Sequence, residues 1–238
     1  MNFKRIVVLV TCLLLAVVIS GHDHFKVYLA KSTMFKDTEV RLKDQFDLKG
    51  SLYKVTALAK FANPVSKNGS RIMDHNAHLT WYAIEFVKGM PPAKRVVIVQ
   101  NQFGKQKFLL GKARFLLLPT LKIKKGHVFP DKLDHFKCYE ILESKFEPRR
   151  VKLTDQFSRA IVSAYVKKPR YFCNPVAKNR GVIKDKRYHL TCYYMEPREE
   201  VVNRKVAIRN QFGANRLYVG KSNILCVPTK KIEFKVVK

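Results

Sequence analysis

Four cysteines outside the N-terminal leader carry the clearest chemical signal in this chain. They are Cys138, Cys173, Cys192 and Cys226, and all lie in its second half. The positions that match them in the first half of the internal repeat are apolar: Val27, Ala62, Trp81 and Leu117. The joint loss of all four thiols predicts two disulfide bonds at buried positions, formed in an oxidising compartment.

Four cysteines allow three pairings. We expect Cys138 to pair with Cys173 and Cys192 with Cys226, each bridge contributing about 3 to 4 kcal/mol in the chain-entropy model. A zinc site is the alternative, but the sequence lacks the closely spaced CxxC pairs that such sites usually contain.

Histidines recur once in each quarter of the chain, as His24, His78, His135 and His189. They suggest metal binding or catalysis, but we favour hydrogen bonding at the start of a strand. A separate metal hypothesis concerns the N-terminus. Cleavage after Gly21 would leave His22-Asp23-His24 at the new terminus. A free amine, two backbone nitrogens and a third-position histidine suit square-planar Cu(II) or Ni(II).

Basic residues outnumber acidic ones throughout the chain. There are 47 Lys and Arg against 18 Asp and Glu, a formal net charge of +29. Without the two basic residues of the leader, 45 against 18 leaves +27. Such a field attracts anionic partners, and salt weakens the attraction. Outside a cell we expect these to be anionic polysaccharide, lipid head groups or extracellular nucleic acid.

Two basic clusters have aromatic neighbours in the sequence. One contains Lys167, Lys168 and Arg170, and the other contains Lys184, Lys186 and Arg187. Interleaved cations and rings can bind nucleic acid or sugars. These six residues are our candidate ligand-binding residues, and solvated strand faces are the alternative explanation.

Motifs of the common enzyme classes are missing from the sequence. It contains no GxSxG, HExxH, Walker loop or GxGxxG. Carboxylates are few and do not recur as a pair. We therefore expect no enzymatic activity and no cofactor.

An internal repeat must position all of these residues. The motif HFKVY at 24–28 returns as HLTWY at 78–82, HFKCY at 135–139 and HLTCY at 189–193. A triplet, DQF at 44–46, returns as NQF at 101–103, DQF at 155–157 and NQF at 210–212. The chain thus consists of four related quarters of about 54 residues, arranged as two pairs.

Each quarter has the pattern of β-strands rather than helices. Apolar and polar residues alternate at 151–154 and again at 161–166, across a turn, which predicts a hairpin. In each triplet we expect the Asp or Asn to bond its own backbone and the Phe to enter the core. Gly104 and Gly213 follow two of the triplets and suit a positive φ. The last strand of each quarter is expected to end at a proline, namely Pro64, Pro119, Pro175 and Pro228.

One quarter buries too little surface to fold alone, whereas two quarters bury enough for one core. We therefore predict an all-β protein with two tandem pseudo-twofold β-barrel or β-sandwich domains, each built from two ~54-residue repeats. Domain 1, the cysteine-free copy, covers 22–126. A linker at 127–132 leads to domain 2, the disulfide-bonded copy at 133–238.

Residues 1–21 are typical of a signal peptide. Two basic residues precede an apolar run at 6–19, and the small residues Ser20 and Gly21 follow. The run is too short to span a bilayer comfortably, and no later run approaches a membrane span. A lipid anchor at Cys12 is the alternative. We expect export, with the mature chain secreted, periplasmic or held at the cell envelope.

The second half of the chain resembles a repeat domain of unknown function found in secreted bacterial proteins. The resemblance rests on HFKCY, VKLTDQF, KPRYFCNPVAKN, HLTCY, RNQFG and ILCVPTKK, in that order within 133–232. Residues 24–123 resemble a diverged copy without the cysteines. The resemblance implies a secreted, disulfide-bonded β domain and brings no catalytic residue with it.

The expected function is an exported, non-enzymatic binding or envelope-associated module that engages anionic surfaces or polymers through a basic face. One alternative is a structural or protein-interaction domain whose partner docks at an exposed strand edge. A third hypothesis is a hydrolase that acts on cell-wall polymer.

Overall fold

The computed structural model describes residues 21–32, 35–198 and 203–237, so nearly all of the expected signal peptide lies outside the described residues. Every regular element in the described part is a β-strand, which confirms the all-β prediction. Across these ranges, no helix offers the length and apolar character that crossing a membrane requires.

Each quarter contributes three strands in the same order. The first quarter forms β1 (His24–Ser32), β2 (Thr38–Asp44) and β3 (Asp47–Lys67); the second forms β4 (His78–Lys88), β5 (Arg95–Asn101) and β6 (Gly104–Lys122). The third forms β7 (His135–Glu143), β8 (Arg149–Thr154) and β9 (Val162–Lys178); the fourth forms β10 (His189–Pro197), β11 (Arg204–Asn210) and β12 (Gly213–Val236).

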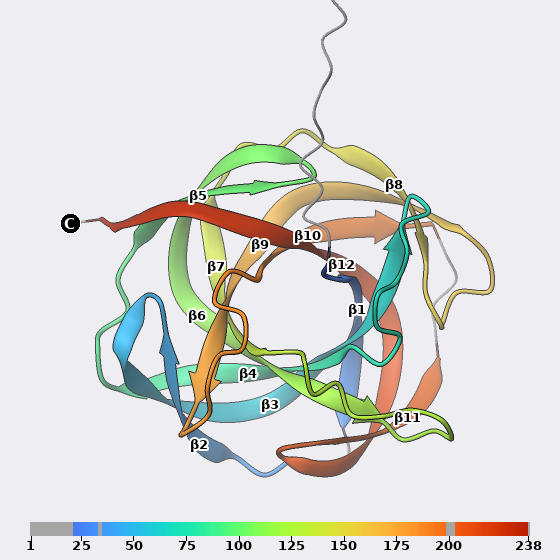
Figure 1. Ribbon diagram of the computed structural model, residues 1–238, viewed down its shortest axis with the longest axis horizontal. Coiled ribbons are helices and arrows are strands. Elements are labelled where there is room, and N and C mark those ends of the chain that lie inside the picture. The colour runs from blue at the N-terminus through green and yellow to red at the C-terminus, as the bar shows by residue number, and fades with distance from the viewer. Residues whose placement is uncertain (1–20, 33–34, 199–202, 238) are drawn as a thin grey trace, which may run out of the picture.

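Eight of these strands close into an antiparallel ring (Figure 1). Its order is β1, β3, β4, β6, β7, β9, β10, β12 and back to β1. The two halves of the chain meet twice, at β6–β7 and at β12–β1. The two tandem domains expected at 22–126 and 133–238 are therefore replaced by one ring that both halves share. Residues 127–132 connect two paired strands of this ring instead of separating two domains.

The other four strands, β2, β5, β8 and β11, form hairpin arms around the ring. Each pairs with the long strand that follows it in the sequence (Figure 1). Each arm also pairs with the quarter diagonally opposite. β2 pairs with β9, β8 with β3, β5 with β12 and β11 with β6. The first quarter is thus tied to the third, and the second to the fourth.

The inside of the ring is an apolar cluster to which all four quarters contribute. The four cysteines and their counterparts Val27, Ala62, Trp81 and Leu117 are fully buried together in it. The bridges join Cys138 to Cys173 and Cys192 to Cys226, so the expected pairing is confirmed and none of these four cysteines is free to bind zinc. Two disulfides suggest an oxidising, extracellular or periplasmic environment.

Buried polar contacts hold the diagonal quarters together. The Asp155 carboxylate accepts hydrogen bonds from the Tyr28 hydroxyl at 2.9 Å and from the Asn63 amide at 2.8 Å. The Lys26 ammonium lies 3.9 Å from the same carboxylate, and both side chains are fully buried. The same contacts recur on the opposite side of the ring. There the Asp44 carboxylate accepts from the Tyr139 hydroxyl at 2.8 Å and lies 3.4 Å from the Lys137 ammonium. Each carboxylate therefore neutralises a buried lysine of another quarter.

The second and fourth quarters make the same contact without charge. Asn101 donates to the Tyr193 hydroxyl at 2.8 Å, and Asn210 donates to the Tyr82 hydroxyl at 2.9 Å. At the positions of the two buried lysines these quarters have Thr80 and Thr191. Since an unpaired buried charge is costly, loss of the carboxylate goes together with loss of the lysine.

The expectation that each proline ends its strand is wrong. Each strand continues past its proline, because the proline lies where the strand is paired on one side only. β3 pairs with β4 as far as Ala62, but its pairing with β1 continues through Pro64 to Val65. Pro228 likewise stays paired with Leu190 after the ladder with β1 has finished at Cys226. A missing N–H is tolerated on a side that carries no neighbouring strand.

The triplet turns follow the prediction. Asp44 accepts hydrogen bonds from the amide of Phe46 at 3.0 Å, and Asn101 accepts from the amide of Phe103 at 2.8 Å. Gly104 and Gly213 have φ values of 101° and 100°, in the left-handed region that glycine favours. The Asp and Asn side chains thus serve two roles, since they also reach the opposite quarter.

Candidate functional site

The four repeated histidines and four lysines lie at one end of the ring. Each histidine is the first residue of β1, β4, β7 or β10. The lysines follow each proline by three residues, as Lys67, Lys122, Lys178 and Lys231. Neighbouring strands of the ring are antiparallel. The histidines at the starts of four strands and the lysines beyond the prolines of the other four therefore meet at the same end of the ring. We call each His–Lys pair, with the Gln and Phe of the next triplet, a junction.

In three of the four junctions, the Gln of the triplet, which belongs to the next quarter, meets the histidine of the previous one. Gln102 contacts His24, and the Gln211 carbonyl lies 3.2 Å from the His135 ring. Gln156 lies 3.5 Å from the His78 ring. These contacts join successive quarters at their shared end.

The Phe of each triplet lies beneath the lysine of the same junction. The ammonium groups are 4.8 to 5.5 Å from the ring centroids in the pairs Lys67–Phe103, Lys122–Phe157, Lys178–Phe212 and Lys231–Phe46. A cation over an aromatic face is attracted by the ring quadrupole. All four lysines are partly withdrawn from water, and burial lowers the pKa of each.

The repeated histidines are neutral at pH 7 and stay apart. Burial, reinforced by a nearby lysine, lowers the pKa of His24, His135 and His189 to about 4. The same causes lower the pKa of His78 to about 3. Within the described ranges, no three His, Cys, Asp or Glu side chains are grouped so as to hold a metal ion. The histidines therefore sit in four separate junctions, each beside a lysine.

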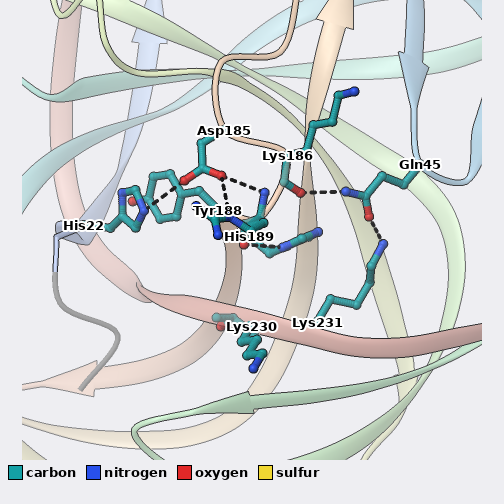
Figure 2. Close-up of a pocket in the computed structure, with 10 residues that line it drawn as sticks. His22, Gln45, Asp185, Lys186, Tyr188, His189, Lys230 and Lys231 are labelled. Atoms are coloured by element: carbon teal, nitrogen blue, oxygen red, sulfur yellow. Dashed lines mark hydrogen bonds and ion pairs between the residues drawn. The ribbon is translucent and has the colours of Figure 1, made fainter. Parts of the chain in front are cut away.

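The fourth junction opens into a pocket of about 470 Å³ (Figure 2). Its lining combines four cations and one carboxylate with neutral hydrogen-bonding groups, namely His22, Gln45, Asp185, Lys186, Arg187, Tyr188, His189, Thr229, Lys230 and Lys231. The loop between β9 and β10 supplies four of these, His189 begins β10, and β12 supplies three. We call this cavity the Lys231 pocket.

Gln45 is diverted from the histidine of its junction. Its amide nitrogen donates to the Lys186 carbonyl at 2.6 Å, and its carbonyl oxygen accepts from the Lys231 ammonium (Figure 2). The His189 Nδ1 donates to the Arg187 carbonyl at 2.9 Å. The other nitrogen, Nε2, is thus an acceptor, and it has no hydrogen-bond partner among the described residues. The histidine of the junction that opens into the pocket therefore has an acceptor without a partner among the described residues, whereas the histidines of the other three junctions each contact a glutamine.

Lys231 is the cation best placed to attract an anion into the pocket. Its ammonium lies over Phe46 at 4.8 Å and over Phe234 at 4.7 Å from the ring centroids. Burial lowers the pKa of Lys231 to about 8, although the Asp44 carboxylate acts in the opposite direction. Asp44 already pairs with Lys137. An incoming anion would restore to Lys231 the charge stabilisation that burial removes.

Asp185 is the one carboxylate among the residues that line the pocket, and it holds the pocket wall in place. Its oxygens lie 3.3 Å from His22 Nε2 and accept from the Arg187 amide at 2.8 Å. The His22 ring stacks on Tyr188 with centroids 3.8 Å apart. Asp185 therefore orders the loop around Arg187, whose Nε lies 3.8 Å from its carboxylate, instead of neutralising Lys231.

The structure divides the six predicted ligand-binding residues. Lys186 and Arg187 line the Lys231 pocket, and Lys184 next to them donates to the carbonyls of Asp131 and Leu133. The cluster on β9 does not line this pocket. There, Lys167 pairs with Glu196 at 3.1 Å, while Lys168 and Arg170 are exposed.

The proposed terminal metal site, His22 and His24, is split between different partners. His22 stacks on Tyr188 in the pocket, whereas His24 contacts Gln102 in the first junction. The hypothesis also needs a free amine after cleavage, which no contact in the structure tests. It stays a prediction.

Sequence reasoning missed the lysines that define the junctions. Their signal was present, because a lysine follows all four prolines by three residues. What the sequence could not reveal was that the triplet of the next quarter would fold over them. That contact depends on how the quarters are ordered around the ring.

A family model described as a repeat of unknown function, DUF7450, matches residues 78–228. The match runs from the first residue of β4 to Pro228 in β12 and so spans three of the four quarters. No curated protein and no solved structure matches the chain. Since the matched residues make up more than half of its length, the chain belongs to the DUF7450 family of repeats of unknown function.

Proposed function

We propose that this protein is an exported, non-enzymatic module, secreted or held at the cell envelope, that binds acidic polysaccharide through its basic face. The single observation that carries the proposal is the Lys231 pocket. It gathers Lys186, Arg187, Lys230 and Lys231 around one cavity. The disulfides and the leader sequence support export.

Acidic polysaccharide is the anionic partner that suits the lining best. His189 adds a neutral acceptor beside the cations, because its Nε2 has no hydrogen-bond partner among the described residues and can accept from a sugar hydroxyl. Phe46 and Tyr188 are poor platforms for bases, because both are only 6% exposed, and the exposed Phe234 does not line the pocket. Lipid head groups and nucleic acid are the other anionic partners, and they serve as comparisons in the test.

A protein partner is the second candidate, and one part of the fold favours it. The end of β12 pairs with β5 and presents three exposed apolar side chains, Ile232, Phe234 and Val236. Strand edges with apolar side chains are common docking sites for extended segments. A single stoichiometric protein partner in a pull-down, lost on truncation after Lys231, would support this alternative.

Chromatography on immobilised heparin, used as a model acidic polysaccharide, tests the main proposal. We expect retention that salt reverses, and earlier elution when Lys231→Gln and Arg187→Gln are combined. Lys178→Gln combined with Lys67→Gln is the matched control, since it also removes two charges, at equivalent junctions that lack the pocket cations. Lack of retention at low salt, or equal elution of both variants, would count against the proposal. Stronger binding to anionic vesicles or single-stranded DNA would point to the other partners.

A further inference from the structure

The Lys231 pocket has a counterpart across the ring. β6 and β12 are four steps apart in the ring of eight, so they run in the same direction on opposite sides of it. Their lysines, Lys122 and Lys231, therefore lie at the same end of the molecule. A half-turn about the ring axis relates Phe46 to Phe157 and Arg95 to Arg204.

Two cations share one ring at this second junction. Lys122 Nζ lies 5.5 Å and Arg204 Cζ 5.3 Å from the centroid of Phe157. The Lys122 ammonium also donates to the Gln156 carbonyl. An open hollow of about 500 Å³ adjoins them, and its lining adds the exposed Lys124 and Lys205.

Among the described residues, the cations of this hollow outnumber the carboxylates near them. Asp155 lies close to Lys122, but it already pairs with Lys26 and accepts from Tyr28. Where the first quarter has a second buried carboxylate, Asp47, the third has Ser158. Burial lowers the pKa of Lys122 to about 8, and repulsion by Lys124 acts in the same direction. A bound oxyanion would offset both effects.

The remaining two junctions lack this feature. Among the described residues, Phe103 has Lys67 as its one cation and Phe212 has Lys178. Within the described ranges, a second cation over the triplet ring is confined to the junctions of Lys231 and Lys122. There Arg95 Cζ lies 5.2 Å from the Phe46 centroid, and Arg204 Cζ lies over Phe157. The half-turn of the ring relates the two junctions that have a second cation to each other, and it likewise relates the two junctions that have one cation.

We propose that the hollow around Lys122, Arg204 and Lys124 is a second oxyanion site, and that the module is bivalent toward acidic polysaccharide. This inference rests on the proposed function. Sulfate or carboxylate groups of one polymer, or of two, would occupy both sides of the same end of the ring. Bivalence raises the affinity for a long polymer well above that for a short one when both sites engage.

Calorimetric titration of the full chain with a heparin tetrasaccharide tests the proposal. We expect two bound tetrasaccharides per chain, and one after Lys122→Gln is combined with Arg204→Gln. The pair Lys231→Gln and Arg187→Gln should also leave one, whereas Lys178→Gln should leave two. Long heparin should bind the wild type about 10²- to 10⁴-fold more tightly than either double variant.

The outcomes separate the two proposals. One tetrasaccharide per wild-type chain, lost in the Lys231 variant alone, would overturn the second site and leave the proposed function standing. No binding at all would overturn both. Two sites that persist when Lys122 and Arg204 are replaced would also overturn the assignment. If that variant does not fold, Lys124→Gln with Lys205→Gln, both on exposed residues, should weaken the second site at least threefold.

Discussion

Single residues decide which quarters of this ring meet. Lys26 is fully buried, and the carboxylate that compensates it comes from Asp155, far away in the sequence. Breaking a buried ion pair by removing one partner leaves an uncompensated charge, which is strongly destabilising. Where the chain lacks the carboxylate it also lacks the lysine, as at Thr80. Charge matching therefore helps to specify the diagonal contacts.

Asp155→Asn should lower the free energy of unfolding by about 3 to 5 kcal/mol, because the Lys26 charge loses its partner. Adding Lys26→Thr copies the combination found in the second and fourth quarters and should recover at least half of the loss. Denaturant unfolding of the single and double variants measures both values. A double variant no more stable than the single one would contradict charge matching.

Binding of acidic polysaccharide should weaken as the pH rises through about 8. Burial lowers the pKa of Lys231 and of Lys122 to about 8, so both ammonium groups lose their charge above that pH. Exposed lysines remain charged there, since their ordinary pKa is about 10.4. Heparin affinity measured from pH 7 to 9 checks this. Lys231→Arg with Lys122→Arg is the control, and its affinity should change little because guanidinium stays protonated.

Residue-scale prediction from the sequence succeeded where the repeat supplied a comparison within the chain. The apolar counterparts of the cysteines identified buried positions, and all of these positions are fully buried. The partners of Asp44 and Gln45 were not predictable in this way. They lie in other quarters, and local spacing does not encode the order of quarters around a ring.

Strands and bridges act at the scale of the element. The hairpin arms were predictable, since alternation and triplet turns are local patterns. The docking of each arm on the opposite quarter was not, because it needs β3, β6, β9 and β12 to continue past their prolines. A proline that ends one ladder and leaves the other intact has the same sequence signal as one that ends a strand.

Replacing the bridge of the third quarter by the residues of the first should preserve the fold. Cys138→Val with Cys173→Ala copies Val27 and Ala62, which fill the same buried positions. The bridge closes a loop of 35 residues. Its loss should lower the free energy of unfolding by about 3 to 4 kcal/mol. Denaturant unfolding tests this, and a loss below about 1 kcal/mol would show that the bridge constrains little.

The whole molecule behaves as one unit if the ring is closed. The halves share two strand pairings and one central cluster, in which Trp81 of the second quarter packs with cysteines of the third and fourth. Two independent domains would unfold separately, whereas a shared sheet should unfold in one cooperative step.

Trp81 fluorescence can report on this, because it is the one tryptophan of the chain. Removing the Cys192–Cys226 bridge should shift the unfolding midpoint seen by Trp81 as much as the midpoint seen by far-UV circular dichroism. A Trp81 midpoint that stays at its wild-type value would show that the halves unfold independently.

The central functional claim is that anionic polysaccharide is bound at particular lysines and not by net charge alone. A lysine-resolved acetylation footprint, read by mass spectrometry with and without heparin tetrasaccharide, tests it most directly. We predict protection of Lys231, Lys230 and Lys186 first and of Lys122 and Lys124 next, with Lys67 and Lys178 unchanged. Uniform protection of all exposed lysines, including Lys49 and Lys107, would contradict the claim.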